Sequence, residues 1–175
     1  MDEIEYKGKR YLRTTAKWVN SDNCLAVHET LQKELNAAFL EALDISEYGV
    51  RELVAEGDKF KESYTYDYAI KFYDSAARVC DRDTLSYILP RITACYRQLH
   101  MPRSAIELFS FAKNKYGDQF ITPVLLTSVA AAYCDLGEYE NALRCCKWAY
   151  KRFDAQFDAS LRNVFARIKK ESGLE

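Results

Sequence analysis

Apolar residues recur at intervals of three and four from about residue 46 to residue 171. This spacing gathers them on one face of a helix, so the pattern predicts helices throughout this part of the chain. The recurring positions fall into three blocks: Leu53, Gly57, Phe60, Ala69, Ile70, Tyr73, Ala76 and Ala77; Leu89, Ile92, Thr93, Tyr96, Leu99, Ala105, Ile106, Phe109 and Ala112; and Leu126, Val129, Ala130, Tyr133, Leu136, Ala142, Leu143, Cys146 and Ala149.

A break inside each block divides it into two helices. The breaks are the stretches KESYTYD, QLHMPRS and DLGEYE. Pro102 suits a first helical position, and Thr122 with Pro123 reads as an N-cap followed by a first helical residue. Pro90 lies within a predicted helix over 84–99, where it removes a hydrogen bond, so we expect either a kink or a late helix start.

The blocks also repeat. Ala69, Ala105 and Ala142 follow one another at intervals of 36 and 37 residues. Helix pairs at this period are typical of solenoid proteins, in which each pair buries its apolar face against the next.

Within residues 50–152 the blocks resemble the tetratricopeptide repeat (TPR) family. That family places small residues where two helices approach closely and aromatic or large residues beside them. The matching residues are Ala130, Tyr133, Gly137, Tyr139, Ala142, Cys146 and Ala149; Thr93, Tyr96, Ala105, Phe109 and Ala112; and Gly57, Phe60, Tyr66, Ala69, Tyr73 and Ala76. The sequence departs from the family with Tyr64 and His100 where glycine is usual, and with Pro102 in an aromatic position.

The resemblance implies an all-α fold, a TPR-like right-handed superhelix of antiparallel helix pairs. We expect three pairs over 46–155 and a capping helix over 156–175, where apolar residues form one stripe between 158 and 171. Residues 23–45 are expected to hold a packing helix over 24–43. Residues 1–22 are expected to form an arm, possibly a β-hairpin centred on Lys7-Gly8.

The resemblance also implies a concave groove lined by the first helix of each pair. The groove positions are Arg51, Val54, Ala55, Asp58, Lys61 and Glu62; Tyr87, Pro90, Arg91, Ala94, Arg97 and Gln98; and Val124, Thr127, Ser128, Ala131, Cys134 and Asp135. Chaperone-binding members grip a peptide carboxylate with Lys, Asn and Arg. Here Val54, Asp58, Val124 and Ser128 occupy those places, so we expect no binding of chaperone tails.

We therefore predict a non-catalytic adaptor or scaffold that binds a peptide or a partner helix in this groove. The candidate contacts are Tyr87, Arg91, Arg97, Gln98, Thr127, Ser128, Asp58 and Lys61. Tyr87, Arg91 and Arg97 would hold an acidic or phosphorylated segment by charge-assisted hydrogen bonds. The alternative is that these are solvated helix charges.

A second hypothesis concerns the N-terminal segment, whose basic and aromatic residues alternate in a way that suits single-stranded nucleic acid. The residues are Lys7, Lys9, Arg10, Arg13, Lys17 and Trp18. A structural role, with Trp18 and Tyr11 packed on the first helices, is favoured because nearby acids offset the charge. A third hypothesis is a self-associating structural module, which would form a homo-oligomer.

Composition narrows the class further. Charged residues make up 29% of the chain and the formal net charge is −1, so no global field favours nucleic acid or an anionic membrane. We see no signal peptide and no membrane span. The six cysteines form no Cys-x-x-Cys motif. Because no signal peptide would direct the chain to an oxidising compartment, we expect reduced thiols and a cytoplasmic protein. No motif predicts catalysis, a cofactor or a metal site.

Overall fold

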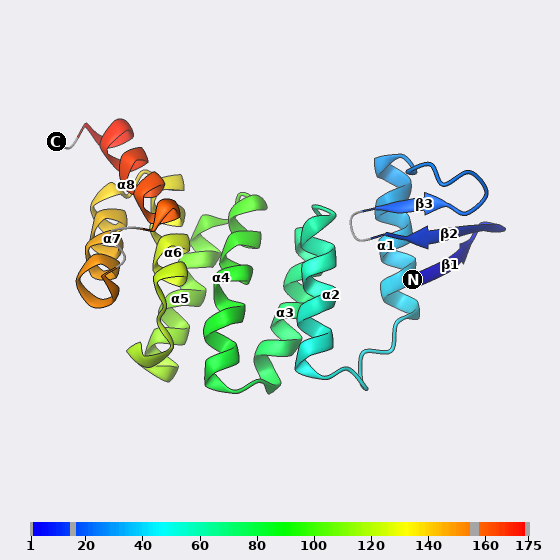
Figure 1. The fold of residues 1–175 in the computed structure, drawn as a ribbon, viewed down its shortest axis with the longest axis horizontal. Helices are drawn as coiled ribbons and strands as arrows, with labels where there is room; N and C mark the ends of the chain where they lie inside the picture. Colours follow the sequence, from blue (N-terminus) through cyan, green and yellow to red (C-terminus); the bar gives the residue numbers. More distant parts are fainter. Residues whose placement is uncertain (1, 15–16, 155–157, 174–175) are drawn as a thin grey trace. The chain divides into compact units, whose positions relative to one another are not determined.

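The computed structural model describes residues 2–14, 17–154 and 158–173. Over these residues the chain is mostly helical, with eight α-helices and a three-stranded antiparallel sheet near the N-terminus (Figure 1). It divides into two compact units, Met1–Phe72 and Tyr73–Glu175, and the boundary falls inside one helix. The predicted boundary at 155/156 lies outside the described residues.

The sheet of the first unit contains β1 (Asp2–Tyr6), β2 (Lys9–Arg13) and β3 (Trp18–Asn20), in that order. β1 and β2 form the hairpin expected at Lys7-Gly8, where both residues have positive φ, 50° and 74°. Two positive φ values suit the tight turns that match the twist of paired strands. The third strand, which the sequence did not predict, pairs with β2.

The core of the first unit joins this sheet to α1 (Glu29–Ala42). Trp18 is buried, its ring lies edge-on to Phe39 with centroids 5.6 Å apart, and its Nε1 donates to Oδ1 of Asn36 at 2.7 Å. α2 (Val50–Glu62) adds Phe60, which stacks on Phe72 of α3 (Tyr66–Val79). The arm is thus a packed layer in which Tyr11 and Trp18 are buried.

The predicted start of the first helix at residue 24 is wrong, since α1 begins at Glu29. The preceding residues pair with β3 instead: Val27 N donates to the Trp18 carbonyl at 3.1 Å, and Val19 bridges to Ala26. A late start at Pro90 is also wrong. α4 (Arg82–Gln98) begins upstream, where the Asp81 carboxylate caps it by accepting from Thr84 N at 2.8 Å.

The second unit holds α4, α5 (Pro102–Tyr116), the 3-10 turn η1 (Asp118–Phe120), α6 (Pro123–Asp135), α7 (Tyr139–Phe153) and α8 (Ala159–Ser172). α6 is its central helix and packs against α4, α5, α7 and α8 (Figure 1). Its sequence is apolar on nearly all sides, as expected of a helix surrounded by others. Seven of its residues are buried: Leu125, Leu126, Val129, Ala130, Ala131, Ala132 and Cys134.

Side-chain caps mark the starts of α4, α6 and α8 in this unit. Oγ1 of Thr122 accepts from Leu125 N at 3.2 Å, and Pro123 follows as the first residue of α6, as predicted. A carboxylate oxygen of Asp158 accepts from Leu161 N at 2.7 Å at the start of α8. Leu161 and Ile168 of α8 then join the core of the unit.

Three helix ends share one backbone geometry. Tyr64, His100 and Gly137 follow α2, α4 and α6, and their φ values are 61°, 58° and 73°. In each case the next residue donates its N–H five residues back, to the carbonyl of Phe60, Tyr96 or Tyr133, at 2.8–2.9 Å. This bond and the left-handed residue are the marks of a Schellman cap, in which glycine is usual.

No helix within the described ranges is long and apolar enough to cross a membrane.

Candidate binding groove

A hollow of about 380 Å³ lies between α4, α6 and α8 of the second unit. We call it the groove. The residues that line it come from the end of α4, one face of α6 and the start of α8: Arg97, Val124, Thr127, Ser128, Ala131, Asp158, Ser160, Asn163 and Val164. Its wall therefore combines hydroxyl, amide and charged groups with a few apolar side chains.

The first turn of α6 places an apolar side chain at the edge of the groove. Val124 directly follows Pro123, and 59% of its surface is exposed. One turn later, the Thr127 hydroxyl donates back to the Pro123 carbonyl at 2.9 Å, so it is held within its own helix. Val124 is therefore available to a ligand, while Thr127 shapes the wall.

Three polar side chains of the groove have no hydrogen-bond partner among the residues that the structure describes. Over the residues that the structure describes, none is hydrogen-bonded to the side chains of Ser128, Ser160 or Asn163. Hydroxyl and carboxamide groups both donate and accept hydrogen bonds. They can therefore pair with the amides and carbonyls of a peptide backbone.

An ion-pair network links the end of α4 to α6 and α8. Nε of Arg97 donates to Asp135 at 2.6 Å, and Nη1 of Arg167 donates to the other oxygen of Asp135 at 2.6 Å. Arg167 also donates to Glu171 at 2.9 Å. Since Asp135 is the last residue of α6, its carboxylate joins three helices at one point.

This network sets the charge states of its members. Burial acts to raise the pKa of Asp135, but the hydrogen bonds from Arg97 and Arg167 outweigh it, so the pKa lies below its usual range. The hydrogen bond to Asp135 raises the pKa of Arg167, and the one to Glu171 adds to this. The guanidinium of Arg97 is thus already compensated by a carboxylate within the protein.

Only some of the predicted peptide contacts line the groove. Arg97, Thr127 and Ser128 line the groove. Tyr87 and Arg91 lie earlier on α4 and pair with each other: the guanidinium of Arg91 stands 3.6 Å from the centroid of the Tyr87 ring, and Nη1 donates to the Tyr87 carbonyl at 3.1 Å. Tyr87 and Arg91 therefore do not line the groove together with Arg97.

The remaining predicted contacts lie elsewhere. Gln98 is exposed at the end of α4 and does not line the groove. Asp58 and Lys61 belong to α2, in the other unit. The resemblance also gave no reason to include α8, which supplies Asp158, Ser160, Asn163 and Val164. Val164 belongs to the apolar stripe of the predicted capping helix, which was expected to pack against the repeats and not to line the groove.

The basic residues of the sheet are largely engaged within the protein. Lys7 donates to Glu34 at 2.7 Å, and Arg10 pairs with Glu3. Arg13 is buried, donates to Glu56 at 2.8 Å and lies over the rings of Phe39 and Phe60. Trp18 is buried too, while Lys9 and Lys17 are exposed.

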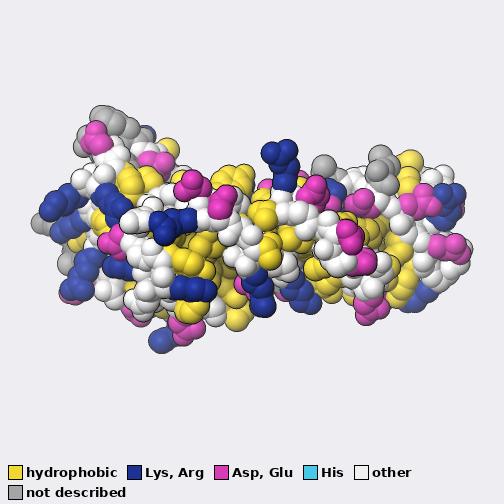
Figure 2. Space-filling view, turned by 90° about the horizontal axis from the view of Figure 1, so that it is seen from below, with side chains coloured by type: hydrophobic (Ala, Val, Ile, Leu, Met, Phe, Trp, Pro, Cys, Tyr) yellow, Lys and Arg dark blue, Asp and Glu magenta, His cyan; other side chains and the backbone are white. Residues whose placement is uncertain are grey.

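The interpretation of Arg13 and Trp18 as surface contacts for nucleic acid is therefore wrong, since both belong to the core. On the face that Figure 2 shows, Lys and Arg side chains are mixed with Asp and Glu side chains rather than gathered in one basic field.

The two adjacent cysteines of α7, Cys145 and Cys146, are poor nucleophiles. Burial raises the pKa of Cys145 to about 11 and that of Cys146 to about 12. Both thiols are then protonated at neutral pH, and the thiolate is the reactive form. Among the described residues, no three His, Cys, Asp or Glu side chains are grouped so that they could hold a metal ion.

Comparison of the chain with protein-family models and with curated proteins finds no match.

Proposed function

We propose that the chain is a TPR-like repeat protein that binds a peptide or a partner helix in the groove, without catalysis. The repeat assignment is supported by the three left-handed residues Tyr64, His100 and Gly137, which recur at the intervals found in the sequence. It is also supported by Ala69, Ala105 and Ala142, none of which has any exposed surface. Small buried residues at these places let paired helices approach closely.

The observation that carries the binding proposal is the composition of the groove. Side chains of Ser128, Ser160 and Asn163, which have no partner among the described residues, stand beside the exposed Val124. Binding sites typically combine an apolar surface with a few convergent polar groups. An apolar side chain of the peptide would pack on Val124, and its backbone would pair with the three polar side chains.

The compensated Arg97 refines the class of ligand. A guanidinium that is already paired with Asp135 gains less from a second carboxylate than an unpaired one would. We therefore propose that the groove recognises the backbone and one apolar side chain of the ligand. Binding does not require a phosphate or a run of acidic residues.

The test compares Val124→Glu with Leu25→Glu. Both replace an exposed apolar residue, 59% and 66% exposed, but only Val124 lines the groove. Tagged proteins are used to capture partners from the cell that produces the chain. We expect Val124→Glu to lose partners that the unchanged protein and Leu25→Glu retain, because a charge would be desolvated against the apolar part of the ligand.

Asn163→Ala provides a milder second variant, since Asn163 is exposed on α8. Loss of one peptide hydrogen bond should weaken capture by about fivefold. Circular dichroism verifies that each variant keeps its helices. If Val124→Glu and Asn163→Ala capture the same proteins as the unchanged chain, the groove is not the binding site.

A further inference from the structure

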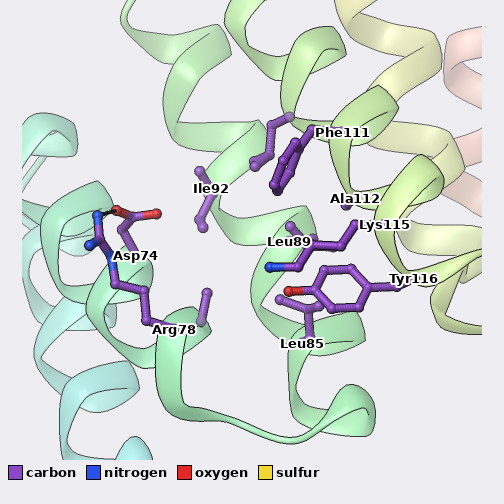
Figure 3. Close-up of a pocket in the computed structure, with 11 residues that line it drawn as sticks. Asp74, Arg78, Leu85, Leu89, Ile92, Phe111, Ala112, Lys115 and Tyr116 are labelled. Atoms are coloured by element: carbon purple, nitrogen blue, oxygen red, sulfur yellow. Dashed lines mark hydrogen bonds and ion pairs between the residues drawn. The ribbon is translucent and has the colours of Figure 1, made fainter.

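A second hollow in the Tyr73–Glu175 unit differs from the groove in chemistry. It measures about 370 Å³ and lies between α3, α4 and α5. We call it the α3–α5 pocket. Its floor is apolar and comes mainly from α4, whose Leu85, Leu89 and Ile92 are buried. Figure 3 shows these three side chains between the charged pair of α3 and the aromatic residues of α5.

One wall extends the apolar surface outward. Phe111 of α5 lines the pocket and is 60% exposed. Because burial of a Phe side chain is favourable, its exposure beside an apolar hollow favours a partner that covers it.

The charged groups at the rim are not equivalent. On α3, Arg78 donates to Asp74 at 3.0 Å, so these two charges offset each other. On α5, Lys115 lies 5.6 Å from the centroid of the Phe111 ring and 5.0 Å from that of Tyr116. None of the described carboxylates forms an ion pair with Lys115. The rim thus holds one cation whose charge is left for a ligand.

The directions of the side chains agree with this charge. In Figure 3 the Lys115 ammonium and the Tyr116 hydroxyl both point toward the space over Leu89 and Leu85. A carboxylate there would meet an ammonium and a hydroxyl donor, next to an apolar floor that fits aliphatic or aromatic side chains.

We propose that the α3–α5 pocket docks an amphipathic helix of a partner protein, which places apolar side chains one turn apart on Leu85, Leu89, Ile92 and Phe111 and an Asp or Glu against Lys115. The exposed Phe111 favours a helix over a small molecule, because a small molecule is usually enclosed by its site. Helices recognised in such grooves present anchors at i and i+4. This site is separate from the groove and does not rest on the function proposed for it.

The test uses a displayed library of 16-residue amphipathic helices. Leu, Phe or Trp is allowed at i and i+4, and the flanking positions are random. Selection is carried out on the full chain. We expect enrichment of Asp and Glu at one flanking position, and binding that weakens as salt is added, because charge pairs at an exposed rim are screened.

Three variants assign the binding to the pocket. Phe111→Ser should weaken an enriched peptide by at least about tenfold, since it removes the exposed anchor surface. Lys115→Met should weaken it about fivefold and remove most of the salt dependence. Val124→Glu, which changes the groove, should leave the affinity unchanged. Phe111 and Lys115 are exposed, and melting curves verify that their variants fold.

The proposal is overturned if no peptide is enriched, if enriched peptides show no acidic preference, or if Phe111→Ser binds them as tightly as the unchanged chain. Sedimentation at several concentrations tests whether a second copy of the chain occupies the pocket. An unchanged chain that dimerises, together with a monomeric Phe111→Ser, would make a second copy the occupant and would also overturn the proposal.

Discussion

Asp135 shows how much one residue can organise in this protein. Its carboxylate accepts from Arg97 of α4 and from Arg167 of α8 while it ends α6. In the sequence it is one aspartate among many, because its partners lie 38 and 32 residues away. The network aligns the end of α4 with α6 and α8 and thereby shapes one end of the groove.

Asp135→Asn is expected to lower the free energy of unfolding by about 1–2 kcal/mol at pH 7, because it leaves two guanidinium groups with a weaker acceptor. Solvent screening limits the loss, because 36% of the Arg167 side chain is exposed. Asp74→Asn, which breaks the exposed pair with Arg78, is the matched control and should change stability by less than about 0.5 kcal/mol.

The pH dependence of this difference has a definite sign. The pKa of Asp135 is lower in the folded chain than in the unfolded chain, so its contribution is present above the unfolded pKa, about 4. It is lost as the pH falls through the folded pKa. Urea unfolding should therefore show the gap between the unchanged chain and Asp135→Asn closing below about pH 4. A gap that widens on acidification would contradict the assignment.

At the scale of elements, the residues that follow α2, α4 and α6 show the repeat. Tyr64, His100 and Gly137 adopt the same left-handed conformation, although only one of them is glycine. A left-handed conformation costs a residue with a side chain about 1–2 kcal/mol, and glycine avoids that cost. The same backbone thus carries strain at His100 and none at Gly137.

Opposite changes at these two positions should have opposite effects. Gly137→Ala should lower the free energy of unfolding by about 1 kcal/mol, although a Cβ there would meet no atom within 4 Å. His100→Gly should raise it by about 0.5 kcal/mol, because relief of strain exceeds the added freedom of the unfolded chain. Lys147→Ala, at an exposed helical site, is the control in urea titrations. Equal effects of Gly137→Ala and Lys147→Ala would contradict the shared geometry.

Local signals in the sequence predicted the elements well. The Thr122 cap and Pro123 as first helical residue depend on neighbouring residues alone, and both are present. β3 was missed because three residues are too short for an alternating pattern. The groove was predicted only in part, because α8 and the pairing of Arg97 with Asp135 depend on tertiary packing.

At the scale of the whole molecule, each of the two units contains its own tryptophan. Trp18 is buried in the first unit, and Trp148 packs against the core of the second. Fluorescence of single-tryptophan variants can therefore report on each unit separately. The first unit also contains a buried ion pair between Arg13 and Glu56, and both residues belong to that unit.

Arg13→Met should destabilise the first unit by about 2 kcal/mol, because it removes one of the two cations that pair with the buried Glu56 carboxylate and leaves Lys59 as the other. The midpoint of urea unfolding should fall more when it is followed at Trp18 than at Trp148. Arg13→Met with Glu56→Leu should recover most of the loss, since apolar residues can replace a buried pair. Arg10→Met, which breaks an exposed pair with Glu3, should cost less than about 1 kcal/mol.

Site-specific photo-crosslinking tests directly whether a protein partner binds in the groove. A photoreactive amino acid is placed at Val124, in the groove, or at Leu25, which is equally apolar and exposed but outside it. The protein is irradiated in the cell that produces it. We expect discrete protein adducts from position 124 that are absent from position 25. The same adducts from both positions, or none from position 124, would contradict this expectation.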